Sequence, residues 1–458
     1  MTPLAFIHDL GFDDLPRPVV AQAKRCVLDL VGVAASGVKT DLSRIVRDHA
    51  VRHMGTGTGG ARILLDGRRA SPAGAAFAGA STIDAFDAHD GHPLTKGHAG
   101  VAVLPALFAV ADAEGGGDGR DLLVALVLGY EVAIRAGIAL HASVPDYHTS
   151  GAWNALGCAA VAARLLGLSA DATRHALGIA EYHGPRSQMM RCIDHPTMVK
   201  DGSGWGAFAG VSAAYLAADG FTGAPAITIE AGGAAEPWSD LGRRWRILEL
   251  YFKPQPVCRW AQPAIEAALA LTAPALAGGA RLDPERIRSV AVETFDAAAR
   301  LGTRPPATTE EAQYGLGFPL AAALVRGHLG PGDISGEGLR DERVLRLLER
   351  ITVAERGEFT RRFPAERIAS VRIVLDDGRV LESAPTAARG DADAPLGDDE
   401  LGAKFELLAA AVPRSRRAAI AAAVEALDCG ARLESDLLPL LLAAPRWAGE
   451  RRQAAGAA

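Results

Sequence analysis

Apolar residues recur at helical spacing over most of the first 260 residues. Residues 19–33 place apolar side chains three and four positions apart, and residues 72–88 are apolar on nearly every side, which is typical of a buried helix. Small residues dominate, so that neighbouring helices can approach closely. The same spacing predicts further helices at 104–113, 122–140, 152–166, 170–180 and 207–218.

The pattern changes near Pro263. Residues 286–295 and 367–375 alternate apolar and polar side chains, as half-buried strands do. The second stretch continues through Asp376-Asp377-Gly378 into residues 379–382, which predicts a hairpin. Helical stretches lie between these strands, at 319–326 and 341–349, and the helical pattern resumes over 401–442.

This order of elements predicts a mainly α fold. We expect a large all-helical domain built from both chain ends, residues 1–263 and 391–458, with a smaller α+β lid domain inserted at 264–390. Residues 389–400 are polar and form the expected return linker.

Charge and cysteine content exclude several classes of function. The 48 basic and 54 acidic residues give a net charge of −6, so nothing favours nucleic acid or a membrane surface as a partner. Five scattered cysteines contain no C-x-x-C pair, which argues against a disulfide framework or a structural zinc site. The N-terminus carries early acidic residues and does not resemble a secretory signal, and we expect a cytoplasmic protein.

Lysine is rare, with six residues among the 48 basic ones. A buried lysine can lose its proton and serve as a base, whereas arginine stays charged. The surviving lysines are therefore candidates for function, although chance accounts for any single one equally well. They are Lys24, Lys39, Lys96, Lys200, Lys253 and Lys404.

Residues 84–98, DAFDAHDGHPLTKGH, hold the densest cluster of reactive side chains. If the preceding helix runs to about Ala88, Asp84 and Asp87 lie on one of its faces, and the helix breaks near Gly91. Acids, neutral bases and one cation in a small volume can differ widely in protonation state. Two alternatives are a metal site, for which the spacing matches no known zinc geometry, and a solvated loop. The candidate metal ligands are His89, Asp90, His92 and His98.

Three further clusters follow. Residues 146–154 place Tyr147 and His148 at the start of a helix, where a substrate carboxylate would be attracted, although capping by Thr149 or Ser150 is the simpler interpretation. Lys200 precedes an uncharged run of small residues and is a candidate base or anion clamp, or a partner of Asp201. Residues 253–263, KPQPVCRWAQP, lie at the predicted domain boundary, where clefts are frequent.

In this order the clusters resemble the MmgE/PrpD family, which includes 2-methylcitrate dehydratase, cis-aconitate decarboxylase and iminodisuccinate epimerase. The resemblance covers nearly the whole chain, and its force comes from the ordered set of motifs. The motifs are Asp87, Asp90, His98 and Pro105, the G-Y-E-V helix from Gly129, H-x2-G-x-W-x2-L-G from His148, Lys200, K-P-x-P-x-C-R-W from Lys253, and Lys404-Phe405. The resemblance implies the helical fold with an inserted lid, a homodimer, and no required cofactor or metal.

Three departures from the family bear on the activity. Decarboxylase-type members carry a threonine where this chain has Gly91 or His92, and a histidine where it has Gln262. Many members also continue K-x-L-H after the central lysine, whereas here Asp201-Gly202-Ser203 follow. Residues 94–98 and 147–151 look more like the epimerase branch, in which residues matching Tyr147 and Lys200 are candidate acid/base groups.

We therefore expect proton abstraction α to a carboxylate of a small di- or tricarboxylic acid, with epimerisation as the reaction. Lys200 and Tyr147 would be the acid/base pair, and cations from Lys96, His98 and Arg191 would neutralise the intermediate. The alternatives are a lyase of the same family, a metallohydrolase, and a catalytically silent polycarboxylate-binding dimer. The expected catalytic residues are Lys200, Tyr147, His98, Asp87 and Lys96, and the expected substrate-binding residues are His89, Asp90, His92, His148, Arg191, Lys253, Arg259 and Gln262.

Overall fold

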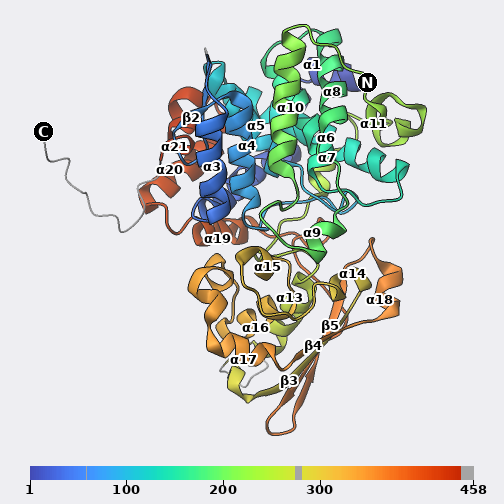
Figure 1. Cartoon of the computed structure of the whole chain (residues 1–458), viewed down its shortest axis with the longest axis vertical. Coiled ribbons are helices and arrows are strands. Elements are labelled where there is room, and N and C mark those ends of the chain that lie inside the picture. Colours follow the sequence, from blue (N-terminus) through green and yellow to red (C-terminus); the bar gives the residue numbers. More distant parts are fainter. Residues whose placement is uncertain (58, 274–280, 445–458) are drawn as a thin grey trace, which may run out of the picture.

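A computed structural model describes residues 1–57, 59–273 and 281–444 of the chain. The last part of the predicted helical range, 445–458, and residues 274–280 of the predicted lid lie outside this description. Figure 1 shows the helices of the N-terminal half and α19–α21 at one end of the molecule. The sheet and α13–α18 gather at the other end. The fold is mainly α with a small α+β part, as the sequence predicts, and the exact domain boundaries stay a prediction.

The helical end contains helices from both termini of the chain. The first group comprises α1 (Pro3–Asp9), α2 (Arg17–Gly37), α3 (Asp41–His53), α4 (Pro72–Asp84), α5 (Gly100–Ala113), α6 (Gly119–Ser143), α7 (Gly151–Leu165), α8 (Ala170–His183), α9 (Met190–Asp194), α10 (Ser203–Ala218), α11 (Ile227–Glu230) and α12 (Ala235–Trp238). The C-terminal group comprises α19 (Asp398–Leu408), α20 (Arg414–Glu425) and α21 (Leu438–Leu441). A two-stranded sheet, β1 (Ala61–Arg62) and β2 (Arg69–Ala70), precedes α4.

Small residues let the long helices pack closely. A Cβ atom on Gly210 of α10 would lie 2.3 Å from the backbone oxygen of Ala155 in α7. A Cβ atom on Gly157 of α7 would lie 2.5 Å from the oxygen of Gly129 in α6. No side chain fits at either crossing, which is why glycine stands there. Helix α6 is long and apolar enough to cross a membrane, but 94% of its apolar 18-residue stretch is buried inside the protein.

The two ends of the chain meet where α19 packs on α2. The Nζ atom of Lys404 lies 2.6 Å from Oδ1 of Asp29, and both side chains are buried. The hydroxyl of Ser36 donates to the backbone oxygen of Leu408 at 2.6 Å. A buried ion pair needs its partner close by, so these contacts fix α19 on the N-terminal helices.

The sheet at the other end has the strand order β4-β3-β5-β6, with β7 also paired to β5. Strand β3 is parallel to β4 and antiparallel to β5, with Val292 opposite Val353 and Val371. The predicted strands at 286–295 and 367–375 and the hairpin through Gly378 are confirmed. The strands are β3 (Ile287–Thr294), β4 (Ile351–Glu355), β5 (Ile368–Leu375), β6 (Val380–Glu382) and β7 (Thr386–Ala387). The helices of this part are α13 (Gln262–Thr272), α14 (Asp296–Ala299), α15 (Thr309–Gln313), α16 (Gly317–Arg326), α17 (Glu342–Leu348) and α18 (Gly357–Arg362).

Candidate active site

A small cavity of about 20 Å³ is lined by several of the predicted site residues, and a cavity of this size holds about one water molecule. Larger hollows of about 620 and 830 Å³ lie elsewhere, and neither brings together the clustered acids and histidines. The lining comes from the loop after α4, the α6–α7 loop, α9, the segment before α13, and the α+β part. It consists of Asp87, Lys96, His98, Tyr147, Met189, Ile193, Tyr251, Lys253, Cys258, Arg259, Trp260, Tyr314 and Arg367.

Asp87 and Lys253 form a buried ion pair at this cavity. The Nζ atom of Lys253 bonds Oδ1 of Asp87 and lies 3.2 Å from the backbone oxygen of the same residue. Burial by itself raises the pKa of Asp87, but the adjacent Lys253 and further positive charges outweigh it, and the pKa falls below its usual range. Asp87 is therefore ionised at neutral pH.

His98 is a neutral base with one free ring nitrogen. Its Nδ1 lies 2.6 Å from the backbone oxygen of Asp90, which can only accept, so Nδ1 carries the hydrogen. The Nε2 atom then holds a lone pair and lies 3.9 Å from Oδ1 of Asp87. Burial and the charge of Lys253 hold the pKa of His98 well below its usual value. His98 is thus neutral with a lone pair on Nε2, and it does not supply the cation expected from the sequence.

His89 packs edge-on against His98, with ring centroids 4.3 Å apart. Its Nε2 atom lies 3.4 Å from Oδ1 of Asp84, yet within residues 1–57, 59–273 and 281–444 neither ring nitrogen has a hydrogen-bond partner. Burial is the main cause that raises the pKa of Asp84, to about 6. Asp84 is the last residue of α4, so the helix ends before Asp87, and the expected helical face shared by these two acids does not form.

The metal alternative retains only part of its expected ligand set. Asp87, His89 and His98 bring potential ligand atoms within 4.8 Å of one another. The carboxylate of Asp90 instead accepts from the hydroxyl of Tyr130 at 2.5 Å. The fourth candidate, His92, also turns elsewhere.

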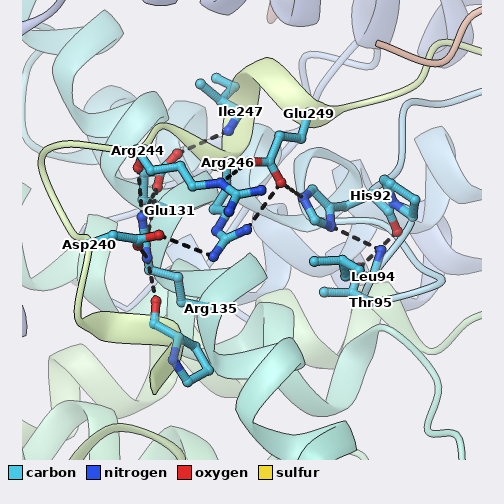
Figure 2. A network of polar contacts seen from close by, with 12 residues as sticks. His92, Leu94, Thr95, Glu131, Arg135, Asp240, Arg244, Arg246, Ile247 and Glu249 are labelled. Atoms are coloured by element: carbon cyan, nitrogen blue, oxygen red, sulfur yellow. Dashed lines mark hydrogen bonds and ion pairs between the residues drawn. The ribbon is translucent and has the colours of Figure 1, made fainter. Parts of the chain in front are cut away.

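His92 belongs to a separate polar network that joins its loop to α6 (Figure 2). Its Nε2 lies 3.3 Å from Oε2 of Glu249, which also pairs with Arg246. Arg135 of α6, fully buried, bonds Asp240 and Glu131 at the far side of the network. Asp90 and His92 therefore anchor the loop and do not line the cavity.

Tyr147 and Lys96 lie together at the cavity wall. The Nζ atom of Lys96 lies 4.5 Å from the centre of the Tyr147 ring, a favourable cation–π arrangement. Burial raises the pKa of Tyr147 well above its usual value, so the phenol is protonated. Lys96 has a positive φ of 50°, and Lys200 has one of 52°, a strained conformation that is typical of functional sites.

The start of α7 is capped by a carboxylate from the same chain. The N-cap residue is Ser150, and within the described part of the chain its side chain makes no capping hydrogen bond to the helix. The backbone N–H of Ser150 donates to Oδ1 of Asp201 at 3.1 Å, and its hydroxyl also bonds this carboxylate. Burial and the nearby charge of Asp84 raise the pKa of Asp201 to about 8. His148, half-buried beside this helix start, is not among the cavity-lining residues.

Lys200 lies behind the cavity wall. Its ammonium group donates to Oε1 of Gln313 at 2.7 Å and lies 4.7 Å from the centre of the Tyr314 ring. The same oxygen of Gln313 accepts from the backbone N–H of Asp87 at 2.8 Å. Lys200 thus contacts two residues that border the site, and Asp201 is not its partner among the described ion pairs.

The remaining predicted binding residues have varied surroundings. Arg191 is exposed and donates to Ser187, outside the cavity lining. Arg259 lines the cavity, but its guanidinium is already paired with Asp391 at 2.6 Å. Gln262 is buried and donates to the backbone oxygens of Gln255 and Val257 at 3.0 Å each, so it holds its own loop in place.

Sequence reasoning missed several residues of the site, among them Tyr251, Gln313, Tyr314 and Arg367. Tyr251 stands two residues before Lys253 and could have been found by its proximity to that motif. Arg367 begins a strand of alternating pattern and looks like an ordinary exposed strand residue, so no signal in the sequence distinguishes it.

Comparison with known proteins matches nearly the whole chain. Residues 4–240 match the MmgE/PrpD N-terminal domain, and residues 256–428 match the MmgE/PrpD C-terminal domain. A cis-aconitate decarboxylase-like protein, oryM, of Aspergillus oryzae is 26% identical over 466 residues, covering 90% of each chain. Cis-aconitate decarboxylase of Aspergillus terreus is 25% identical and covers 94% of this chain and 93% of its own. The Homo sapiens enzyme of that name is 32% identical over 240 residues, 50% of this chain and 48% of its own. With both domains matched in order, the chain belongs to the MmgE/PrpD family.

Proposed function

We propose that this chain catalyses proton transfer at a carbon next to a carboxylate of a small di- or tricarboxylic acid, without a cofactor, and that the net reaction is epimerisation. One observation carries the proposal: a neutral base, His98, and a protonated acid, Tyr147, line the same small cavity. Groups in opposite protonation states at one site are what acid/base catalysis requires.

In the proposed reaction, Nε2 of His98 removes the proton from the α carbon, and the electron pair moves onto the carboxylate as an enediolate. The ammonium of Lys253 and the hydroxyls of Tyr251 and Tyr314 are the donors available to this developing charge. Tyr147 then donates its proton to the carbon. The proton on His98 returns to the tyrosinate before the next turnover, and in the reverse direction the two roles exchange.

Lys200 acts in this scheme from behind the residues that line the cavity, without touching the substrate. Its positive charge lies against the Tyr314 ring and near Asp87, which supports a negatively charged intermediate without direct contact. This differs from the direct acid/base role expected from the sequence. A Lys200→Ala variant with unchanged turnover would remove the residue from the mechanism.

A lyase reaction is the second candidate, because the fungal relatives that span 90% and 94% of the chain are named for cis-aconitate decarboxylation. Loss of carbon dioxide from a tricarboxylate leaves a carbanion of the same kind, which Tyr147 would protonate. Loss of a hydroxyl instead would make the enzyme a dehydratase, as for 2-methylcitrate. The metallohydrolase and the silent polycarboxylate-binding dimer are the alternatives outside this chemistry.

Proton NMR in D₂O tests the proposal directly, with iminodisuccinate, 2-methylcitrate, citrate and cis-aconitate offered separately to the protein. Exchange of an α proton without net loss of substrate, followed by a change in chirality, supports epimerisation. New vinyl signals assign a lyase. His98→Gln should abolish either signal while the protein stays folded, and silence across the panel with wild-type protein contradicts the proposal.

We also propose that the chain works as a homodimer in the cytosol. Helix α10 presents Trp205 and Leu216 to solvent, at 51% and 41% exposure, with the half-buried Phe208 between them. Such an apolar stripe is a suitable contact surface for a second copy. Sedimentation of the wild type against Trp205→Glu measures this, and an unchanged monomer mass in both would contradict it.

A further inference from the structure

Four cations line the cavity, and they differ in how their charges are neutralised. Lys253 is paired with Asp87, and Arg259 is paired with Asp391. Lys96 and Arg367 have no acidic partner among the ion pairs of the described residues. In a low-dielectric site, two cations without an acidic partner at the same cavity favour binding of an anion.

Arg367 is held in place with donor capacity left over. The residue is 7% exposed, one terminal nitrogen donates to the backbone oxygen of Pro93 at 3.1 Å, and its guanidinium carbon lies 6.0 Å from the Tyr251 ring. Its Nε atom is buried and has no hydrogen-bond partner among the residues that the structure describes. A buried unsatisfied donor of this kind is costly unless a ligand completes it.

Lys96 lies close enough to Arg367 for the two positive charges to repel each other. Burial first, and then the positive charge of Arg367, lower the pKa of Lys96. Its ammonium contacts the ring of Tyr147, the proposed proton donor. An anion that contacts both cations would therefore lie beside the reacting carbon.

We propose that Lys96 and Arg367 together bind the second carboxylate of the substrate, the one that does not take part in proton transfer. This rests on the proposed function and makes Arg367 its specificity-determining residue. A guanidinium matches the planar carboxylate and the lysine adds a point charge. A monocarboxylate would leave this pair uncompensated, so the site selects acids with two or more carboxylates.

The position of the two residues adds a consequence for substrate capture. Lys96 belongs to the loop after α4, whereas Arg367 directly precedes β5 in the α+β part. A dicarboxylate needs more room than a cavity of about 20 Å³ offers, so the lining side chains, or the parts that carry them, must move to admit it. A carboxylate that bridges Lys96 and Arg367 then holds the two parts together around the substrate.

Equilibrium dialysis with labelled succinate and with its monoamide tests the subsite without any turnover. Wild-type protein should bind succinate about tenfold to hundredfold more tightly than the monoamide, because one charged contact is worth that much. Arg367→Met and Lys96→Met should each remove this preference, while Arg367→Lys should keep part of it. Arg372→Met is the matched control, since Arg372 lies on β5, the strand that Arg367 precedes, is exposed and pairs with Glu382 at 2.7 Å.

The outcomes separate this inference from the proposed reaction. Equal binding of succinate and the monoamide by wild-type protein, no binding of succinate, or undiminished succinate binding by a folded Arg367→Met variant, would each overturn the subsite. Turnover in the NMR panel together with any of these results would leave the reaction standing. Selective succinate binding lost in Arg367→Met, without turnover of any panel acid, would establish the subsite and contradict the reaction.

Discussion

Replacing Lys253 by methionine should destabilise the protein strongly at neutral pH and much less in acid. Lys253 and Asp87 are 0% and 3% exposed, and methionine has a similar length without the charge. Removing one partner of a buried ion pair costs about 3–5 kcal/mol, because the other charge is left uncompensated.

The pH dependence follows from the two states of Asp87. In the wild type the folded pKa of Asp87 is lowered, so the pair stabilises the fold above the unfolded pKa of about 3.9. That contribution is lost as the pH falls through the folded value. Without Lys253, burial instead raises the pKa of Asp87. The ionised form then destabilises the variant increasingly as the pH rises above about 4.

Urea unfolding followed by circular dichroism, at pH 5 and pH 7.5, measures both effects. The double variant Asp87→Asn/Lys253→Met should regain much of the lost free energy of unfolding, since asparagine carries no charge. Its stability should also depend little on pH. Arg286→Met is the control, because its exposed pair with Asp376 should contribute less than about 1 kcal/mol. A loss below about 1 kcal/mol for Lys253→Met, or the same loss at both pH values, would refute the reasoning.

Three further changes test the site. Gln313→Met removes the oxygen that accepts hydrogen bonds from both Lys200 and the backbone of Asp87, so kcat in steady-state assays should fall about 10²-fold. The control Gln22→Met should leave kcat unchanged. Equal kcat values for the two variants would contradict the positioning role of Gln313. Tyr147→Phe keeps the ring beside Lys96 but removes the acidic hydroxyl, so α-proton exchange measured by NMR should slow by about 10²–10⁴-fold. The melting temperature should stay the same. An unchanged exchange rate would exclude Tyr147 as the acid. Asp201 has a pKa raised to about 8, so its ionisation destabilises the wild type as the pH rises from about 4 to about 8. The melting temperature of Asp201→Asn relative to wild type should therefore increase from pH 5 to pH 8, and a constant difference would show that Asp201 does not titrate in this range.

Periodicity in the sequence predicted the elements well where local contacts decide them. The alternating stretch at 367–375 became β5, and the Asp-Gly turn after it joins β5 to β6. The end of α4 was placed about four residues too late. There the backbone leaves the helix to meet distant partners, such as Gln313, which receives the N–H of Asp87, and Tyr251, which pairs with Gly91. A local pattern carries no information about such contacts.

Within the histidine-rich loop, residue type alone did not show which side chains face the cavity. His98 faces the cavity, whereas Asp90 and His92 turn away from it. Their directions are set by Tyr130 and Glu249, which lie 40 and 157 residues away in the chain. The family resemblance pointed to the loop but could not orient these residues.

The sequence by itself determined the helical and strand content, the family, and the segments that carry reactive groups, because periodicity and ordered motifs are properties of the chain alone. The tertiary structure decided which of those groups meet and in what protonation state. His98 is neutral because it is buried beside Lys253, and Asp87 is ionised because it also lies next to Lys253. Arg367 lines the same cavity as Lys96 only because the α+β part packs on the helices. Burial and long-range charge depend on distances between remote segments, and only the folded chain sets those distances.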